Sequence, residues 1–199
     1  MLFRSTTGNV YLTAVTGISE VASGTPKITT GTLGMLVTGT GDIDVNNANL
    51  VTTLGAKTAS GNIKYTNNQN LNITTVAANT GGNFAGTTNG LDTSATTGKT
   101  VDVKVSTGSL TLNSDVTTNT TGNVYLTAVT GISEVASGTP KITTGTLGML
   151  VTGTGDIDVN NANLVTTLGA KTASGNIKDR KSTRLNSSHS QQSRMPSSA

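Results

Sequence analysis

The side chains best placed for chemistry in this sequence are two aspartates one residue apart, Asp42 and Asp44, which recur as Asp156 and Asp158. In an extended strand the residues i and i+2 point to the same face, so each pair presents two carboxylates side by side. Such a pair could share acid–base work if a basic residue lay beside it. The same spacing also describes the solvent face of a half-buried strand, because the aspartates alternate with apolar residues. We take the second interpretation, and the sequence predicts no catalytic residues.

Nucleophilic and metal chemistry lack their usual residues. The chain has no cysteine, which excludes disulfide scaffolds, zinc ribbons and thiol nucleophiles. Its single histidine, His189, lies in a carboxyl-terminal segment that we exclude from functional reasoning below. The GTGDID stretch at 39–44 has the glycine and aspartate of calcium-binding β-roll repeats, but the nine-residue tandem repetition is missing and two carboxylates supply few ligands. We therefore expect neither a metal site nor a cofactor.

Two asparagines, Asn72 and Asn119, each begin an Asn-x-Thr triplet, the acceptor pattern for N-glycosylation. The chain holds 20 asparagines and 41 threonines, so such triplets are expected by chance. We assign both asparagines to ladder or turn positions.

Both ends of the chain look like translated sequencing adaptor. Residues 179–189 read DRKSTRLNSSH and residues 193–199 read SRMPSSA, which match the translation of a common short-read adaptor and its continuation. LFRS at 2–5 matches the end of the partner adaptor. We therefore treat 1–5 and 179–199 as adaptor-derived, the latter as a disordered tail, and exclude them as one would a tag. The alternative is a natural basic tail.

The formal net charge of +3 resides mostly in that tail. Without residues 179–199 the chain keeps nine basic and nine acidic residues. A neutral body offers no basic surface to a phosphate backbone, so we expect no nucleic-acid partner. The chain also has no run of 18 apolar residues, so we expect no membrane insertion of this segment.

The remaining body, 6–178, contains a long internal repeat. Residues 6–64 recur without a mismatch at 120–178, a period of 114 residues. The repeat keeps the reading frame and the compositional style, which favours a fragment of a tandem array. A duplication introduced during sequence assembly is the alternative.

A shorter, imperfect period marks the strands. A glycine, a small polar residue and then alternating apolar positions occur in GNVYL, GDIDV, GNIKY and GSLTL, which begin at 8, 41, 61 and 108. KTVDVKV at 99–105 varies the pattern. Apolar residues at i and i+2 predict one buried strand face, and the 20 residues between the second and third motifs predict coils of about 19–20 residues, six to a period.

Composition favours stacked parallel coils, a β-solenoid, over a sandwich. In such a stack each side chain meets its counterpart about 4.8 Å away, so like charges would destabilise it, and only 12% of the residues are charged. Threonine and asparagine can hydrogen-bond along the stack. We expect valine, isoleucine and leucine to fill a narrow interior in which an aromatic ring fits badly, and no capping segment.

The segment 79–99 breaks this rhythm. Its larger apolar residues are only Phe84 and Leu91, and it contains GG and NG turn signals. It is either a loop that protrudes from the solenoid, where recognition often occurs, or an irregular but ordinary coil.

The phrases GNVYLTAVTGI, GDIDVNNANL and GSLTLNSDVTTNTTGNVYL resemble the repeat region of filamentous-haemagglutinin-like adhesins. The resemblance covers essentially all of 6–178 and implies a right-handed parallel β-helix. It also implies secretion by a two-partner or autotransporter route, a secreted or cell-surface location, and cell adhesion. The partners would be an unknown surface, host-cell or carbohydrate ligand and further repeats stacked end to end. No signal peptide or secretion domain is recognised, so the export route follows from the resemblance alone.

Two alternatives stay open. A fragment of a β-helix carbohydrate-active enzyme would need a basic residue and a calcium cage, and the body has no arginine. The lysines of the first period are Lys27, Lys57, Lys64, Lys99 and Lys104. A threonine-rich disordered linker is the second, because Val, Ile, Leu and Phe make up 44 of 199 residues, about 22%, close to the composition of disordered chains.

Overall fold

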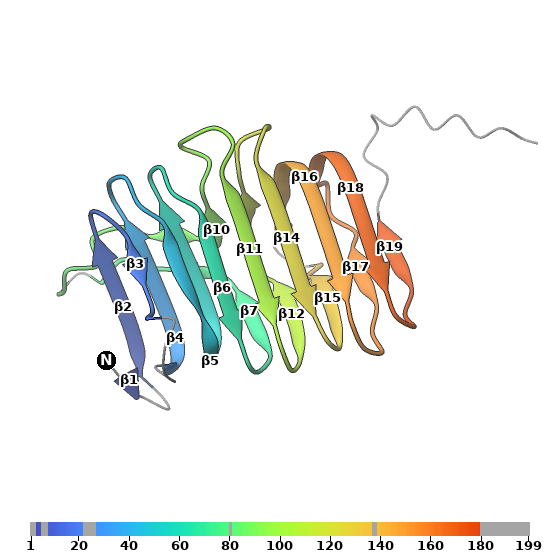
Figure 1. The fold of residues 1–199 in the computed structure, drawn as a ribbon, viewed down its shortest axis with the longest axis horizontal. Coiled ribbons are helices and arrows are strands. Elements are labelled where there is room, and N and C mark those ends of the chain that lie inside the picture. Colours follow the sequence, from blue (N-terminus) through green and yellow to red (C-terminus); the bar gives the residue numbers. More distant parts are fainter. Residues whose placement is uncertain (1–2, 5–7, 22–26, 80, 137–138, 180–199) are drawn as a thin grey trace, which may run out of the picture.

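A computed structural model describes residues 3–4, 8–21, 27–79, 81–136 and 139–179. Within these ranges the regular secondary structure is β-strand, with no helix that could cross a membrane. Strands of successive coils pair in parallel, so the chain winds as a β-solenoid (Figure 1), which confirms the predicted fold class. The strands are β1 (Phe3–Arg4), β2 (Asn9–Ala14), β3 (Ile18–Ser19), β4 (Ile28–Val37), β5 (Ile43–Thr58), β6 (Ile63–Asn67), β7 (Leu71–Ile73), β8 (Thr75–Val76), β9 (Thr88–Asn89), β10 (Leu91–Asp92), β11 (Thr100–Val105), β12 (Ser109–Leu112), β13 (Val116–Thr117), β14 (Asn123–Ala128), β15 (Gly131–Glu134), β16 (Ile142–Val151), β17 (Ile157–Val159), β18 (Leu164–Thr172) and β19 (Ile177–Asp179).

The segments predicted to be adaptor-derived lie largely outside the described residues. The exceptions are Phe3–Arg4, which form β1 and pair with β4, and Asp179, which ends β19.

Interior side chains form ladders along the stack, one residue from each coil. The strands alternate between buried and exposed residues, as period-two strands with one buried face should. One ladder runs through Ile18, Ile43, Ile63, Val101, Val124, Leu147 and Leu168.

The coils are longer and less regular than predicted. Ile43 pairs with Ile63, and the coil between them has the predicted length, but the preceding coil, from Ile18 to its partner Ile43, is longer. The coil from Ile63 to its partner Val101 is nearly twice as long as predicted, because it carries an inserted hairpin. The predicted length therefore fits only the shortest of these coils, from which the motif spacing came.

The two copies of the repeat lie in different ladders. Val10 pairs with Leu33, whereas its copy Val124 pairs with Val101 in the ladder that starts at Ile18. Four coils separate Ile18 from Val124, and Ile132, the copy of Ile18, lies beyond Val124 in another ladder. The 114-residue repeat therefore spans more than four coils and fewer than five, and the expectation of six is wrong. The strands within each copy pair in the same register, but the second copy is rotated about the long axis of the solenoid relative to the first.

The interior is mainly aliphatic, with one exception that corrects the sequence prediction. Tyr65 is fully buried in the hydrophobic core, between Val45 and Val103 of the adjacent coils. Its hydroxyl donates a hydrogen bond to Asn67 Oδ1 (3.2 Å). The ring can therefore be buried, because its hydroxyl has a hydrogen-bond partner inside the core. Burial, reinforced by the negative charge of Glu20, raises the pKa of Tyr65 well above its ordinary value.

Buried asparagine side chains hydrogen-bond to backbone N–H and C=O groups at the turns of the coil. Asn67 Oδ1 accepts a hydrogen bond from the Val51 N–H (3.0 Å), and Asn67 Nδ2 donates to the Val51 carbonyl (2.9 Å). Asn49, in register one coil earlier, accepts from the Ile28 N–H (2.6 Å). Asparagines thus stack as predicted, but their amides bond the backbone of an adjacent coil. This satisfies polar groups that would otherwise be buried without partners.

Glycine at the corners allows the coils to approach. A Cβ atom on Gly61 would lie 1.8 Å from the carbonyl oxygen of Gly41, one coil earlier. The copies Gly175 and Gly155 have the same 1.8 Å separation. The glycines that open the motifs at 41 and 61 are therefore required by the backbone of the preceding coil.

We expect Asn67→Leu to lower the free energy of unfolding by about 2–4 kcal/mol, because it leaves the buried N–H and C=O of Val51 unpaired. Urea denaturation followed by circular dichroism measures the change. Asn68→Leu, at the next, partly exposed position, is the matched control and should differ little from the unmodified chain. Equal stability of the two variants would contradict this role of Asn67.

Candidate functional site

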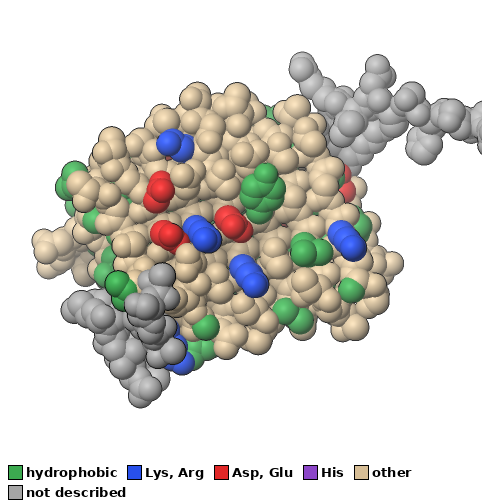
Figure 2. All heavy atoms as spheres, in the orientation of Figure 1, with side chains coloured by type: hydrophobic (Ala, Val, Ile, Leu, Met, Phe, Trp, Pro, Cys, Tyr) green, Lys and Arg blue, Asp and Glu red, His purple; other side chains and the backbone are tan. Residues whose placement is uncertain are grey.

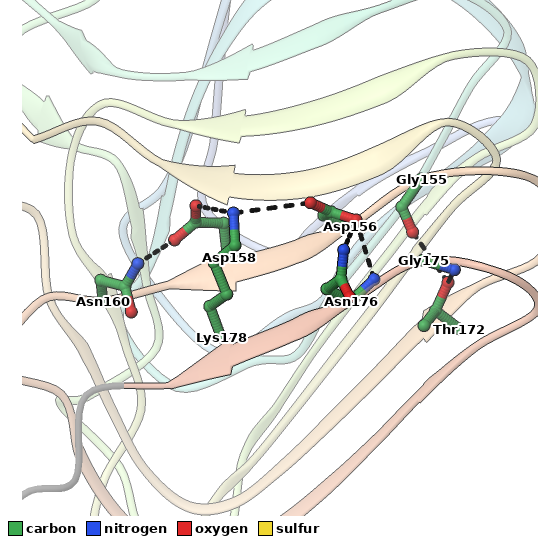
Figure 3. Close-up of polar contacts among 8 residues, drawn as sticks. All are labelled: Gly155, Asp156, Asp158, Asn160, Thr172, Gly175, Asn176 and Lys178. Atoms are coloured by element: carbon green, nitrogen blue, oxygen red, sulfur yellow. Dashed lines mark hydrogen bonds and ion pairs between the residues drawn. The ribbon is translucent and has the colours of Figure 1, made fainter.

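The aspartates singled out by the sequence hold the corners of the solenoid. Asp42 Oδ1 accepts hydrogen bonds from the backbone N–H (2.7 Å) and Nδ2 (3.1 Å) of Asn62, one coil later. Asp156 makes the same contacts with Asn176 in the second copy (Figure 3). The hydrogen bond from the Asn176 N–H, with the nearby Lys178 ammonium, lowers the pKa of Asp156. This carboxylate is charged at neutral pH and suits a structural role better than that of a general acid.

The second aspartate of each pair is also engaged. Asp44 Oδ1 accepts a hydrogen bond from Asn46 Nδ2 (2.6 Å). Its copy Asp158 lies 3.4 Å from Lys178 Nζ, and Lys178 Nζ lies 3.5 Å from Asp156 (Figure 3).

Charges of opposite sign alternate along the stack. Lys64 pairs in register with Asp44 on one side and Asp102 on the other. In Figure 2 the charged side chains near the middle of the view lie close to others of opposite sign, on a largely uncharged surface. Among the register pairs of the described strands, no two like charges lie opposite each other, an arrangement that would destabilise the stack.

Metal and nucleophilic sites gain no support from the geometry. Among the described residues, no group of three or more His, Asp or Glu side chains could hold a metal ion. His189 lies outside the described residues. Asn72 lies within β7 and the Asn119 carbonyl accepts the Gly122 N–H (2.7 Å) in a turn, the strand and turn placements that the sequence suggested.

The irregular segment 79–99 contains a hairpin tip that folds back over the outside of the solenoid. Strands β8 and β9 pair antiparallel, and the segment between them extends from the middle of the stack toward its first coils (Figure 1). Residues 91–92 return to the stack as β10. Both sequence interpretations therefore apply, because part of the segment leaves the coil and part is ordinary coil.

Phe84 anchors this hairpin against the first copy. Its ring is buried, with its centroid 5.1 Å from that of Tyr11 on β2. Thr13 Oγ1 donates a hydrogen bond to the Asn83 carbonyl (3.2 Å). Leu36 and Val76 complete a small apolar cluster outside the main core.

Beside this cluster lies a cleft of about 610 Å³ between β2, the turn that leads into β3, and the hairpin. Its lining includes Tyr11 and the buried Phe84, the hydroxyl-bearing residues Thr13 and Ser19, and two asparagines. The full lining is Tyr11, Leu12, Thr13, Gly17, Ile18, Ser19, Asn79, Asn83 and Phe84. This lining carries no charged side chain, so the cleft suits a neutral ligand with hydroxyl groups and an apolar face. Sequence reasoning noted Phe84 but could not pair it with Tyr11, 73 positions away.

A buried glutamate corner recurs in both copies and was missed by sequence reasoning. Glu134 Oε2 accepts hydrogen bonds from the Asn161 N–H (2.9 Å) and Asn163 Nδ2 (3.2 Å). Glu20 forms the same corner in the first copy, and the Oε1 atom of each glutamate is buried without a hydrogen-bond partner among the described residues. Burial raises the pKa of Glu134 and outweighs these two hydrogen bonds.

Comparison of the chain with protein-family models, with curated proteins and with solved structures finds no match in any of the three. The functional assignment therefore depends on the repeat, the fold and the cleft.

We expect Glu134→Gln to reduce the pH dependence of stability. The folded state raises the pKa of Glu134 above the ordinary value of 4.5, so the fold binds this proton more tightly than the unfolded chain does. The resulting stabilisation is complete below that ordinary value and is lost as the pH rises through the raised pKa. Denaturant midpoints at acidic and neutral pH measure it, and the loss should be smaller in the variant. Identical pH profiles for both proteins would exclude this contribution.

Proposed function

We propose that this chain is a segment of a long secreted bacterial surface protein, in which it serves as a structural stalk or adhesin repeat. The bacterial surface assignment draws on the resemblance of the repeat phrases to filamentous-haemagglutinin-like adhesins. The stalk role draws on the stacking of the two repeat copies.

The observation that carries the stalk role is the unbroken parallel pairing between the copies. β6 of the first copy pairs with β11, β11 pairs with β14, and β14 begins the second copy. Each further repeat can therefore extend the stack by the same contacts, as in other repeat proteins whose units touch only their neighbours. Because a repeat spans a fractional number of coils, successive copies would face different directions around the rod.

For the adhesin role we propose the cleft beside Tyr11, between β2 and the hairpin, as the contact site, with a neutral carbohydrate as the ligand class. Sugar rings have apolar faces that pack on aromatic rings and hydroxyls that hydrogen-bond to threonine, serine and asparagine. We propose no catalytic role, because the paired aspartates are engaged in corner contacts with asparagine and lysine.

Adding one 114-residue repeat to the chain should lengthen the particle by roughly 22 Å, taking four to five coils at 4.8 Å each. Small-angle X-ray scattering of the chain with and without the added repeat measures this increment. The cross-sectional radius should stay constant. An increase in cross-section without lengthening would contradict the stalk role.

Glycan arrays probed with the full chain test the cleft. Neutral glycans should be retained, and retention should persist at about 1 M salt, where electrostatic screening acts within about 3 Å. Tyr11→Ala should weaken binding several-fold. Tyr125→Ala is the matched control, because Tyr125 has the same local sequence but no hairpin beside it. Equal binding by the two variants would exclude the cleft as the site, and leave the stalk role to the scattering measurement.

A further inference from the structure

The hairpin formed by β8 and β9 fills a groove on the first copy, where glycines take the place of residues with side chains. On the outer face Tyr11, Gly34 and Gly55 lie in register on three successive coils. A Cβ on Gly34 would lie 2.9 Å from both Phe84 Cζ and Val76 Cγ1. A Cβ on Gly55 would lie 2.4 Å from Thr88 Oγ1. The two glycines therefore provide the space that the hairpin occupies.

The second copy has the same groove, and it is open. Tyr125, Gly148 and Gly169 lie in register on the outer face of β14, β16 and β18, and we call them the second-copy groove. No described heavy atom outside the immediate chain neighbours lies within 4 Å of a Cβ built on Gly169. Leu150 is 38% exposed, whereas its copy Leu36, under the hairpin, is 8% exposed. The space above these residues is a cleft of about 470 Å³.

The neck of the hairpin also has an equivalent place on the second copy. In the first copy the Thr74 N–H donates to the Leu54 carbonyl (3.0 Å), and the Ala56 N–H donates to the Gly90 carbonyl (2.8 Å). β7 and β10, on either side of the hairpin, pair with the same edge of β5. The copy of this edge is β18, which pairs with only β16 among the described strands. Leu168 is accordingly 41% exposed, whereas Leu54 is fully buried.

An ion pair adds a specific contact. Lys57 Nζ lies 3.0 Å from Asp92 Oδ2, and these two residues are register partners between β5 and β10. Asp92 is the charged residue of the segment 71–92. Lys171, the copy of Lys57, borders the second-copy groove.

We propose that the second-copy groove and the adjoining edge of β18 form a docking site for residues 71–92 of a further repeat of this sequence. The groove and the segment are complementary because the identical groove of the first copy already holds the identical segment. Each hairpin would thus clasp the copy of residues 6–64 that precedes it within the same 114-residue period. Such clasping would fasten the coils of each copy by contacts on the outer surface, in addition to the pairing of their strands. The inference goes beyond the stalk role and does not depend on the carbohydrate cleft.

Titration of the full chain with a synthetic peptide of residues 71–92, followed by isothermal calorimetry, tests the site. Saturable binding with one peptide per chain is expected. Replacing Phe84 by alanine in the peptide should weaken binding at least tenfold, because the anchoring ring is lost. Gly169→Val in the chain should abolish binding without changing its circular dichroism, since the space there is open in the unbound chain. Thr111→Val on β12, which pairs with no strand of the groove, is the control and should bind normally.

Disulfide trapping locates the peptide, because the natural sequence has no cysteine. Lys171→Cys in the chain and Asp92→Cys in the peptide should form a cross-link, since register partners on adjacent strands lie within disulfide range. Thr111→Cys in the chain should not cross-link. No saturable binding, binding that persists in Gly169→Val, or equal cross-linking at both positions would overturn the proposal. A dimer of the chain alone that Gly169→Val dissolves and Phe84→Ala leaves intact would also overturn it, since a different surface of a second molecule would then be the occupant.

Discussion

The whole structure depends on one constraint, which is that each coil must lie in register on the next at the spacing of paired parallel strands. This constraint explains the glycine corners, where Gly61 lies against the Gly41 carbonyl and has no room for a side chain. It also explains why Lys64 lies between Asp44 and Asp102. Buried asparagines such as Asn67 supply hydrogen bonds where the turning backbone cannot pair with itself. Glycine, asparagine and sparse, alternating charge are therefore consequences of stacking.

Each coil packs only on the coils next to it. The 114-residue repeat therefore does not need to equal a whole number of coils. The copies Val10 and Val124 lie in different ladders, yet each packs on the same partners within its own copy, Leu33 and Leu147. The segment between the copies sets the rotation of one copy relative to the other, because its coils differ in length and one of them carries the hairpin. A repeat array built this way is continuous as a rod although its units do not superpose by translation alone. A continuous rod suits the proposed role of an extended stalk.

Identical sequences in different surroundings separate local from long-range effects within one molecule. The corner contacts of Asp42 with Asn62 are repeated by Asp156 with Asn176, so they are local properties of the repeat. The outer faces differ, since the hairpin covers one glycine column and leaves the other open. The cleft beside Phe84 exists for the same reason in one copy only. The proposed contact site is thus added to a uniform scaffold by a single inserted segment.

The sequence by itself determined the strands, the parallel solenoid and the neutral, ladder-forming surface, because period-two alternation and corner glycines are local consequences of stacking. It could not determine the coil number, since that depends on how many residues each corner and insertion takes up. It also could not pair Tyr11 with Phe84 or place Tyr65 in the core, because both depend on contacts between coils. Leu54 and Leu168 show most directly what the local sequence cannot predict. They occupy the same position in identical sequences, yet Leu54 is buried and Leu168 is 41% exposed. Only the tertiary structure decided which coil, if any, covers each of them.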